Sequence, residues 1–320
     1  MNNFKKIGLT ALAGSLVATS VYAGEMSVSG SASWRISNHA GTDGGKTMAM
    51  GNQLTFTGGG EMDNGMNVAL SFILDQGDNG TTATRTEAQG LAEAPFDSHS
   101  ITVSSDAMGS ITYAGEGASS AQNTIDTTAA GDIWDNTFGF VYPTNADAAK
   151  VLTWTLPSVM DGLGVVTSYN MSAAAKEATI GYALTYTGVE GLSVSYGFGE
   201  VGGNTAGTTG SEVTTMKASF AFGPITAAMS INDYDITGAS NEEQSSYKIS
   251  YSVSDELSVS YGSETHETTG QSTDEEFDQI SVSYTTGGLT ASVRQTNADN
   301  VTDATQTEQS QWNVGLSFAF

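Results

Sequence analysis

Hydrophobic and polar residues alternate one by one through many short stretches of this chain. In residues 25–36, the even positions from Met26 to Ile36 are mostly apolar, and the odd positions from Ser27 to Arg35 are polar. A period of two residues places alternate side chains on opposite faces of a β-strand. The same pattern closes the chain at 311–320, where Phe318 and Phe320 share the apolar face. The pattern predicts an all-β protein.

Counting these stretches gives sixteen strands, most of them joined to the next by residues typical of turns. Asp63-Asn64-Gly65, for example, is a strong hairpin signal between the second and third strands. The predicted strands are 25–36, 53–58, 67–74, 98–104, 110–114, 151–156, 163–170, 178–186, 192–198, 215–222, 225–231, 246–253, 257–261, 279–284, 289–295 and 311–320.

The connections alternate between short and long. Those after even-numbered strands are short, and most of those after odd-numbered strands are long, polar and acidic. The long ones are 37–52, 76–97, 115–150, 199–214, 232–245, 262–278 and 296–310. Short turns at one end and long loops at the other are typical of an antiparallel transmembrane β-barrel. An even strand count places both chain ends on the short-turn side, which is the periplasm.

The side chains of the two strand faces agree with a barrel in a membrane. A bilayer requires every backbone N–H and C=O group to be paired, which a closed barrel achieves. The polar face consists mainly of Ser, Thr, Ala, Asn and Gly. A soluble β-sandwich would instead turn its apolar face inward and carry Lys and Glu outside. The scarcity of Lys on the strands therefore favours the membrane barrel.

The N-terminus carries the features of an export signal. Lys5 and Lys6 precede an apolar stretch at 7–18, and Val21 and Ala23 occupy the −3 and −1 positions before a cleavage site. This arrangement predicts a cleaved signal peptide at 1–23 and a barrel at 24–320. The apolar stretch is shorter than the ~20 residues of a spanning helix. No other part of the sequence could form such a helix.

Composition restricts the partners. Charged residues make up 14% of the chain, against about 25% in an ordinary soluble domain. The full chain has a net charge of −25; without 1–23, 8 Lys+Arg face 35 Asp+Glu, giving −27. Such a charge repels nucleic acid. The carboxylates at 242–243 and 274–276 could bind Ca²⁺ or Mg²⁺ loosely, although the preferred interpretation is that these acids are solvated and bind no metal ion.

Enzymatic chemistry finds no support in the sequence. The chain has no Cys, and His39, His99 and His266 have no neighbour at metal-ligand spacing. His99 is the one histidine expected in a strand. The serines lack a nucleophile elbow, and we expect neither catalysis nor a cofactor. Two functions remain open from the residues: a channel, or an adhesive or structural surface protein without channel activity.

Over its whole length, the chain resembles the Gram-negative general diffusion porins, nearest to the alphaproteobacterial type. The signal peptide, the strand at 25–36, the repeated hairpins and Phe320 carry the resemblance. It implies a 16-stranded outer-membrane barrel, usually a homotrimer, with the third long loop folded inward. It also implies passive diffusion of ions and small hydrophilic solutes. The surroundings would be lipid and lipopolysaccharide, and the Phe318 and Phe320 tail would be an assembly signal for barrel assembly machinery.

The resemblance directs attention to the third long loop, 115–150. Its acids Glu116, Asp126, Asp132 and Asp135 are expected at the pore constriction. The basic residues on the polar faces of strands, and so expected in the lumen, are Arg35, Lys217, Lys248 and Arg294. This set is thinner than the family's usual basic cluster. Because acids dominate, we expect cation selectivity. If the barrel closes, a single strand separates the strands that carry the two arginines.

Overall fold

The structure, a computed structural model, describes residues 26–40, 45–76, 98–116, 119–125, 128–131, 133, 150–171, 178–201, 211–235, 240–301 and 308–320. These residues form sixteen antiparallel strands and one short 3₁₀ helix, η2. The strands are β1 (Met26–Ala40), β2 (Gly45–Glu61), β3 (Asn67–Gln76), β4 (Ser98–Ser105), β5 (Gly109–Glu116), β6 (Val151–Thr155), β7 (Leu163–Asn170), β8 (Thr179–Val189), β9 (Leu192–Val201), β10 (Ser211–Phe222), β11 (Ile225–Asp235), β12 (Glu242–Ser252), β13 (Leu257–Thr268), β14 (Glu275–Thr286), β15 (Leu289–Asp299) and β16 (Gln309–Ala319); η2 is Gln122–Thr124.

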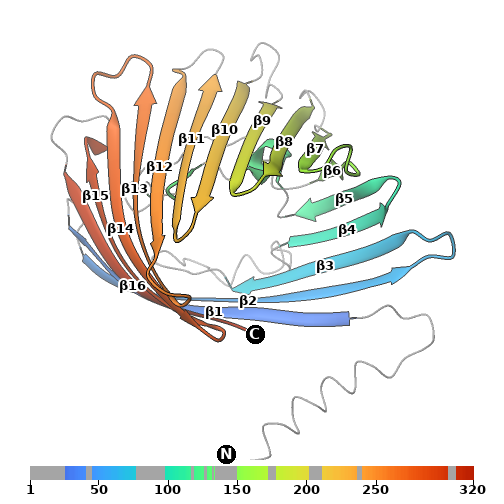
Figure 1. Cartoon of the computed structure of the whole chain (residues 1–320), viewed down its shortest axis with the longest axis horizontal. Helices are drawn as coiled ribbons and strands as arrows, with labels where there is room; N and C mark the ends of the chain where they lie inside the picture. The colour runs from blue at the N-terminus through green and yellow to red at the C-terminus, as the bar shows by residue number, and fades with distance from the viewer. Residues whose placement is uncertain are drawn as a thin grey trace, which may run out of the picture.

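The strands form one closed barrel in which each strand pairs with its neighbours in sequence (Figure 1). Closure occurs between the first and last strands, where Trp34 of β1 pairs with Leu316 of β16. The predicted antiparallel barrel of sixteen strands is confirmed. Closure leaves no free sheet edge, as a bilayer requires.

The polarity of the two faces of the barrel is the reverse of that in a soluble β-protein, because the outer face is apolar and the inner face is polar. Large apolar side chains on the outer face, such as Phe220, Met229 and Ile249, are about half exposed. Buried positions on the inner face include Ser230 and Ser246. A continuous apolar outer surface is suited to lipid. In the described part of the chain, no helix is long and apolar enough to cross a membrane.

Several strands are longer than the sequence predicted. The connection expected at 37–52 is mostly strand, since β1 ends at Ala40 and β2 begins at Gly45. The bounds 232–245, 262–278 and 296–310 were also too wide. The reason is visible where Asp233 pairs with Glu243, and Glu243 with Glu267. The ladder continues there with polar residues on its outer face, so the alternation disappears while the strands do not.

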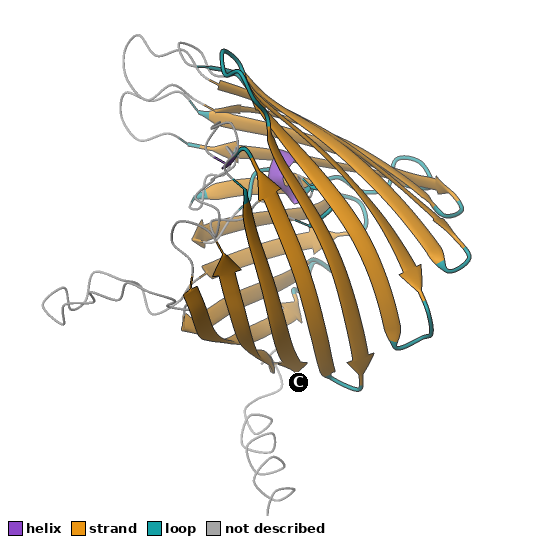
Figure 2. Ribbon diagram, turned by 90° about the vertical axis from the view of Figure 1, so that its left-hand side faces the viewer, coloured by secondary structure: helices purple, strands orange, loops and turns teal. Residues whose placement is uncertain are grey.

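The wall of the barrel is uneven in height. Strands β4, β5 and β7 have eight residues each and β6 has five, whereas β13 and β14 have twelve. The short strands stand together (Figure 1). We call β4–β7 the low wall. Seen from the side, η2 lies within the ring of strands (Figure 2).

Candidate functional site

The connection between β5 and β6 returns into the barrel. We call its described residues, 119–125, 128–131 and 133, the inner segment. Ala121, Gln122, Thr128, Ala130 and Ile133 of this segment are all buried, between 0% and 4% exposed. A surface loop would not bury such a run, so the segment lies packed on the lumen side of the wall. The expected inward-folded third loop is therefore present.

Side chains of the wall hold the first part of the inner segment. The N–H of Ala121 donates to Ser168 Oγ on β7 at 2.7 Å. The Nε2 of Gln122 donates to Thr215 Oγ1 on β10 at 2.6 Å, and that hydroxyl donates to Asn232 Oδ1 on β11. Buried polar groups need such partners, and these bonds cross three separate strands. The segment is thus fixed to the wall by polar contacts.

Glycines on the inner face allow the backbone of the segment to approach. A Cβ atom at Gly197 would lie 3.0 Å from Ile125 Cδ1. One at Gly262 would lie 2.8 Å from the Cβ of Ala130, closer than real Cβ atoms come. The wall under the segment is therefore shaped to receive it. The sequence showed these glycines, but nothing in their spacing indicated what they face.

Two of the four predicted basic residues lie under the inner segment. Lys217 on β10 donates from Nζ to the carbonyl oxygen of Thr128 at 3.0 Å. Lys248 on β12 has its Nζ 3.9 Å from the position that a Cβ would take at Gly131. These lysines therefore neighbour the segment instead of facing it across the lumen.

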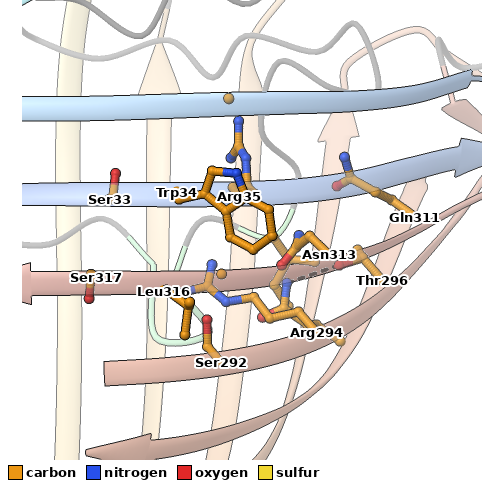
Figure 3. Close-up of a pocket in the computed structure, with 14 residues that line it drawn as sticks. Ser33, Trp34, Arg35, Ser292, Arg294, Thr296, Gln311, Asn313, Leu316 and Ser317 are labelled. Atoms are coloured by element: carbon orange, nitrogen blue, oxygen red, sulfur yellow. Dashed lines mark hydrogen bonds between the residues drawn. The ribbon is translucent and has the colours of Figure 1, made fainter. Parts of the chain in front are cut away.

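The other two basic residues share a pocket on another part of the wall. Arg35 of β1 and Arg294 of β15 line a pocket of about 250 Å³, which Ile133 of the inner segment also borders. Their strands flank β16, where Arg35 pairs with Gly315 and Arg294 with Asn313 (Figure 3). Most other lining residues carry a hydroxyl or amide group: Ser33, Ser292, Thr296, Gln279, Gln311, Asn313 and Ser317; the rest are Trp34, Ala49, Gly315 and Leu316. The structure thus brings the two arginines together and keeps them apart from the two lysines.

The predicted acids of the constriction are only partly visible. Asp126, Asp132 and Asp135 lie outside the described residues. Glu116 ends β5, where its backbone pairs with His99, and its side chain is not described. Their place in the lumen therefore stays a prediction.

A row of buried polar residues was not anticipated from the sequence. Thr215, Asn232, Gln244, His266 and Glu275 are successive partners across β10 to β14. All five are at most 3% exposed. Alternation placed Thr215 in a predicted strand and Gln244 in the predicted loop 232–245. Neither was predicted to be buried, because burial depends on parts of the chain that are distant in sequence.

The expectation that His99 is the only strand histidine was wrong. His266 lies in β13 and His39 in β1. The ring nitrogens of His266 lie 3.4 Å from Glu275 Oε2 and 3.5 Å from Glu242 Oε2. The polar extension of β13 had been assigned to a loop, which hid this strand position. Within the described ranges, no group of three or more His, Asp or Glu residues is placed to hold a metal ion.

The last residue completes the closure of the barrel. Gly30 and Phe320 exchange two backbone hydrogen bonds of 2.9 and 3.0 Å. A Cβ at Gly30 would lie 2.6 Å from Phe320 Cζ, so the terminal ring occupies the space over this glycine. The rings of Phe318 and Phe320 stack at a centroid distance of 6.1 Å. The tail therefore packs on β1.

A closed sixteen-strand barrel with an apolar outer face and a segment packed inside its lumen defines the class of outer-membrane channel proteins. Comparison with known sequences is consistent: residues 8–320 match the Gram-negative porin family. The chain belongs to this family. It is an outer-membrane channel and not an enzyme, which sets aside the adhesin alternative. No curated protein sequence matches the chain significantly.

Solved structures show the same fold at low identity. An anion-selective porin from Comamonas acidovorans is 11% identical, with a TM-score of 0.72 over 93% of this chain and 100% of its own. Salmonella typhi OmpF, in complex with daunomycin, is 13% identical, with a TM-score of 0.70 over 93% and 98%. OmpT of Vibrio cholerae is 13% identical, with a TM-score of 0.67 over 95% and 99%.

Proposed function

We propose that this porin is a cation-selective channel for passive diffusion of ions and small hydrophilic solutes. The observation that carries the proposal is the charge: 35 Asp+Glu against 10 Lys+Arg in the chain. Two of the described cationic side chains in the lumen, Arg35 and Arg294, share one pocket, so the positive charge of these two residues is confined to one part of the wall. Acids in the remaining loops attract cations to the mouth.

A reversal-potential measurement in a planar bilayer under a KCl gradient tests the proposal. We expect the potential to have the sign of K⁺ preference. Anion preference, which is the selectivity of the structurally similar porin from Comamonas acidovorans, contradicts it. Asp132→Asn with Asp135→Asn should weaken the preference. Unchanged selectivity would mean that these two residues do not line the constriction.

We also propose that the chain forms a homotrimer through the low wall. Eight residues at about 3.3 Å each, tilted by about 40°, rise roughly 20 Å, less than the ~25 Å apolar band of such barrels. Apart from Glu116, β4–β7 contain no acidic residue. Outer-face acids such as Glu243 and Glu276 lie instead on β12 and β14. Copies of a strongly acidic chain would meet there without repulsion.

Disulfide cross-linking of a Tyr113→Cys variant tests this surface. If no species larger than the monomer forms, the result contradicts the proposed interface.

The remaining partners are proposals supported by family membership. Removal of residues 1–23 would be seen by N-terminal sequencing of the exported protein. Barrel assembly machinery would recognise the C-terminal segment with Phe318 and Phe320, and lipopolysaccharide would surround the outer face. We propose no cofactor; the acidic extensions, as at Glu242 and Glu243, are where any loosely held Ca²⁺ or Mg²⁺ would lie.

A further inference from the structure

We propose that Glu264 on β13 is the positioning residue that keeps the inner segment against the wall, and thereby fixes the open cross-section of the pore. The proposal rests on the proposed function, in which the inner segment narrows the channel. Glu264 is 1% exposed. A buried carboxylate is costly unless it is hydrogen-bonded. Two groups that donate to this one are the N–H of Ile133 in the inner segment and the hydroxyl of Ser246, which also binds the segment.

Glu264 binds the segment directly at one point. The N–H of Ile133 donates to Glu264 Oε2 at 3.0 Å. Ile133 then packs with Ala130 of the segment and with Phe277, Ala298 and Val301 of the wall side in one buried apolar cluster. The carboxylate therefore fixes the segment at the point where it enters that cluster.

Glu264 acts at a second point through Ser246 on β12, its direct partner in the sheet. Ser246 Oγ accepts the N–H groups of Ala129 at 3.0 Å and Ala130 at 2.8 Å. A hydroxyl has two acceptor sites and one proton. With both acceptor sites used, the proton must be donated elsewhere, and Glu264 Oε1 lies 3.3 Å away. The carboxylate thus orients the hydroxyl that holds two further amides.

Glutamine cannot replace this carboxylate. One of its two terminal atoms is an amide nitrogen, which donates and does not accept. In Glu264→Gln, either Ile133 N–H or the Ser246 hydroxyl would face a donor. The other end of the segment is independent of this change, because Ala121 is held by Ser168 on β7. Release should therefore be local to residues 128–133.

Thiol labelling tests the proposal in the full-length chain, which has no cysteine of its own. Ala130→Cys and Ala121→Cys, each in the otherwise unchanged chain, should both react slowly with a small methanethiosulfonate reagent. Adding Glu264→Gln should accelerate labelling at position 130 by about tenfold or more, with no change at position 121. Open-channel current should become noisier. Glu243→Gln, an exposed residue on β12, removes one charge nearby and should change neither rate.

Ser246→Ala gives a second test if Glu264→Gln does not fold, as judged by heat-modifiable gel migration. It should also accelerate labelling at position 130. Unchanged labelling at position 130 in a folded variant overturns the proposal, and so does equal acceleration at positions 121 and 130. Absence of stepwise current in the unmodified protein would instead contradict the proposed function, because labelling does not depend on current.

Discussion

Removing either lumen arginine should increase the preference for cations. Arg35 and Arg294 line one pocket from strands on both sides of β16. Since an arginine remains charged at any accessible pH, each places a permanent positive charge on the lumen wall. Arg35→Ala and Arg294→Ala each remove one such charge while leaving the strand pairing intact.

The magnitude follows from Coulomb's law. A monovalent ion passing about 8 Å from a guanidinium in water has an interaction energy of about 0.5 kcal/mol. That energy changes the local cation and anion concentrations by a factor of about 2.4 each, in opposite directions. The cation-to-anion permeability ratio should therefore rise about sixfold per arginine at low salt. At 0.1 M, where the Debye length is about 10 Å, the effect should fall to about twofold.

Reversal potentials of the variants, measured under KCl gradients at several mean concentrations, check both the sign and the salt dependence. Lys46→Ala is a matched control, because Lys46 is exposed near the start of β2, on the same strand face as Met48 and Met50. It should change the ratio little. The reasoning is refuted if both arginine variants leave the ratio unchanged at low salt, or if their effect does not weaken with added salt.

Gly262→Val places a side chain where Ala130 lies, so we expect a displaced inner segment and altered single-channel conductance in a barrel that still migrates as folded. Gly164→Val, with only an ordinary 3.8 Å contact to a wall carbonyl, is the control, and equal conductance in the two variants would count against the close fit. Deleting Phe320 should reduce insertion into membranes more than the conductance of barrels that do insert; normal insertion would break the link. Gly30→Leu, which occupies the space of the Phe320 ring, should reduce insertion in the same way.

The alternation of apolar and polar residues was sufficient to predict the barrel, because a strand with one face in lipid must alternate in this way. Each of the sixteen predicted strands coincides with one in the structure, since apolar and polar neighbours alternate wherever one face meets lipid. The pattern failed above the apolar band. Asp233, Glu243 and Glu267 pair side by side on the outer face. The inner face beside them carries buried polar residues such as Gln244 and His266, so both faces are polar and the alternation disappears.

The sequence predicted the positions of lumen side chains only where they follow from the alternation along a strand and from the order of the strands. Counting along the strands placed Arg35 and Arg294 on polar faces, one strand apart across β16, and the structure puts them in one pocket. Glu264 shows the limit. Its burial depends on Ile133, which lies 131 residues away in sequence. No local pattern announces such a contact, and the polar residues around Glu264 resembled an ordinary acidic loop.

The inner wall has two parts that differ in what their side chains contact. Where the inner segment lies, Gly197, Gly262 and Ser246 leave room for its backbone or hold it. On β1 and β15, where a pocket remains, the wall carries Arg35 and Arg294. Long cationic side chains keep their charged ends in water or on a polar partner. Lys217, under the segment, binds the carbonyl oxygen of Thr128, whereas Arg35 and Arg294 line the pocket that remains. The sequence of the wall therefore determines where the segment packs as much as the loop does.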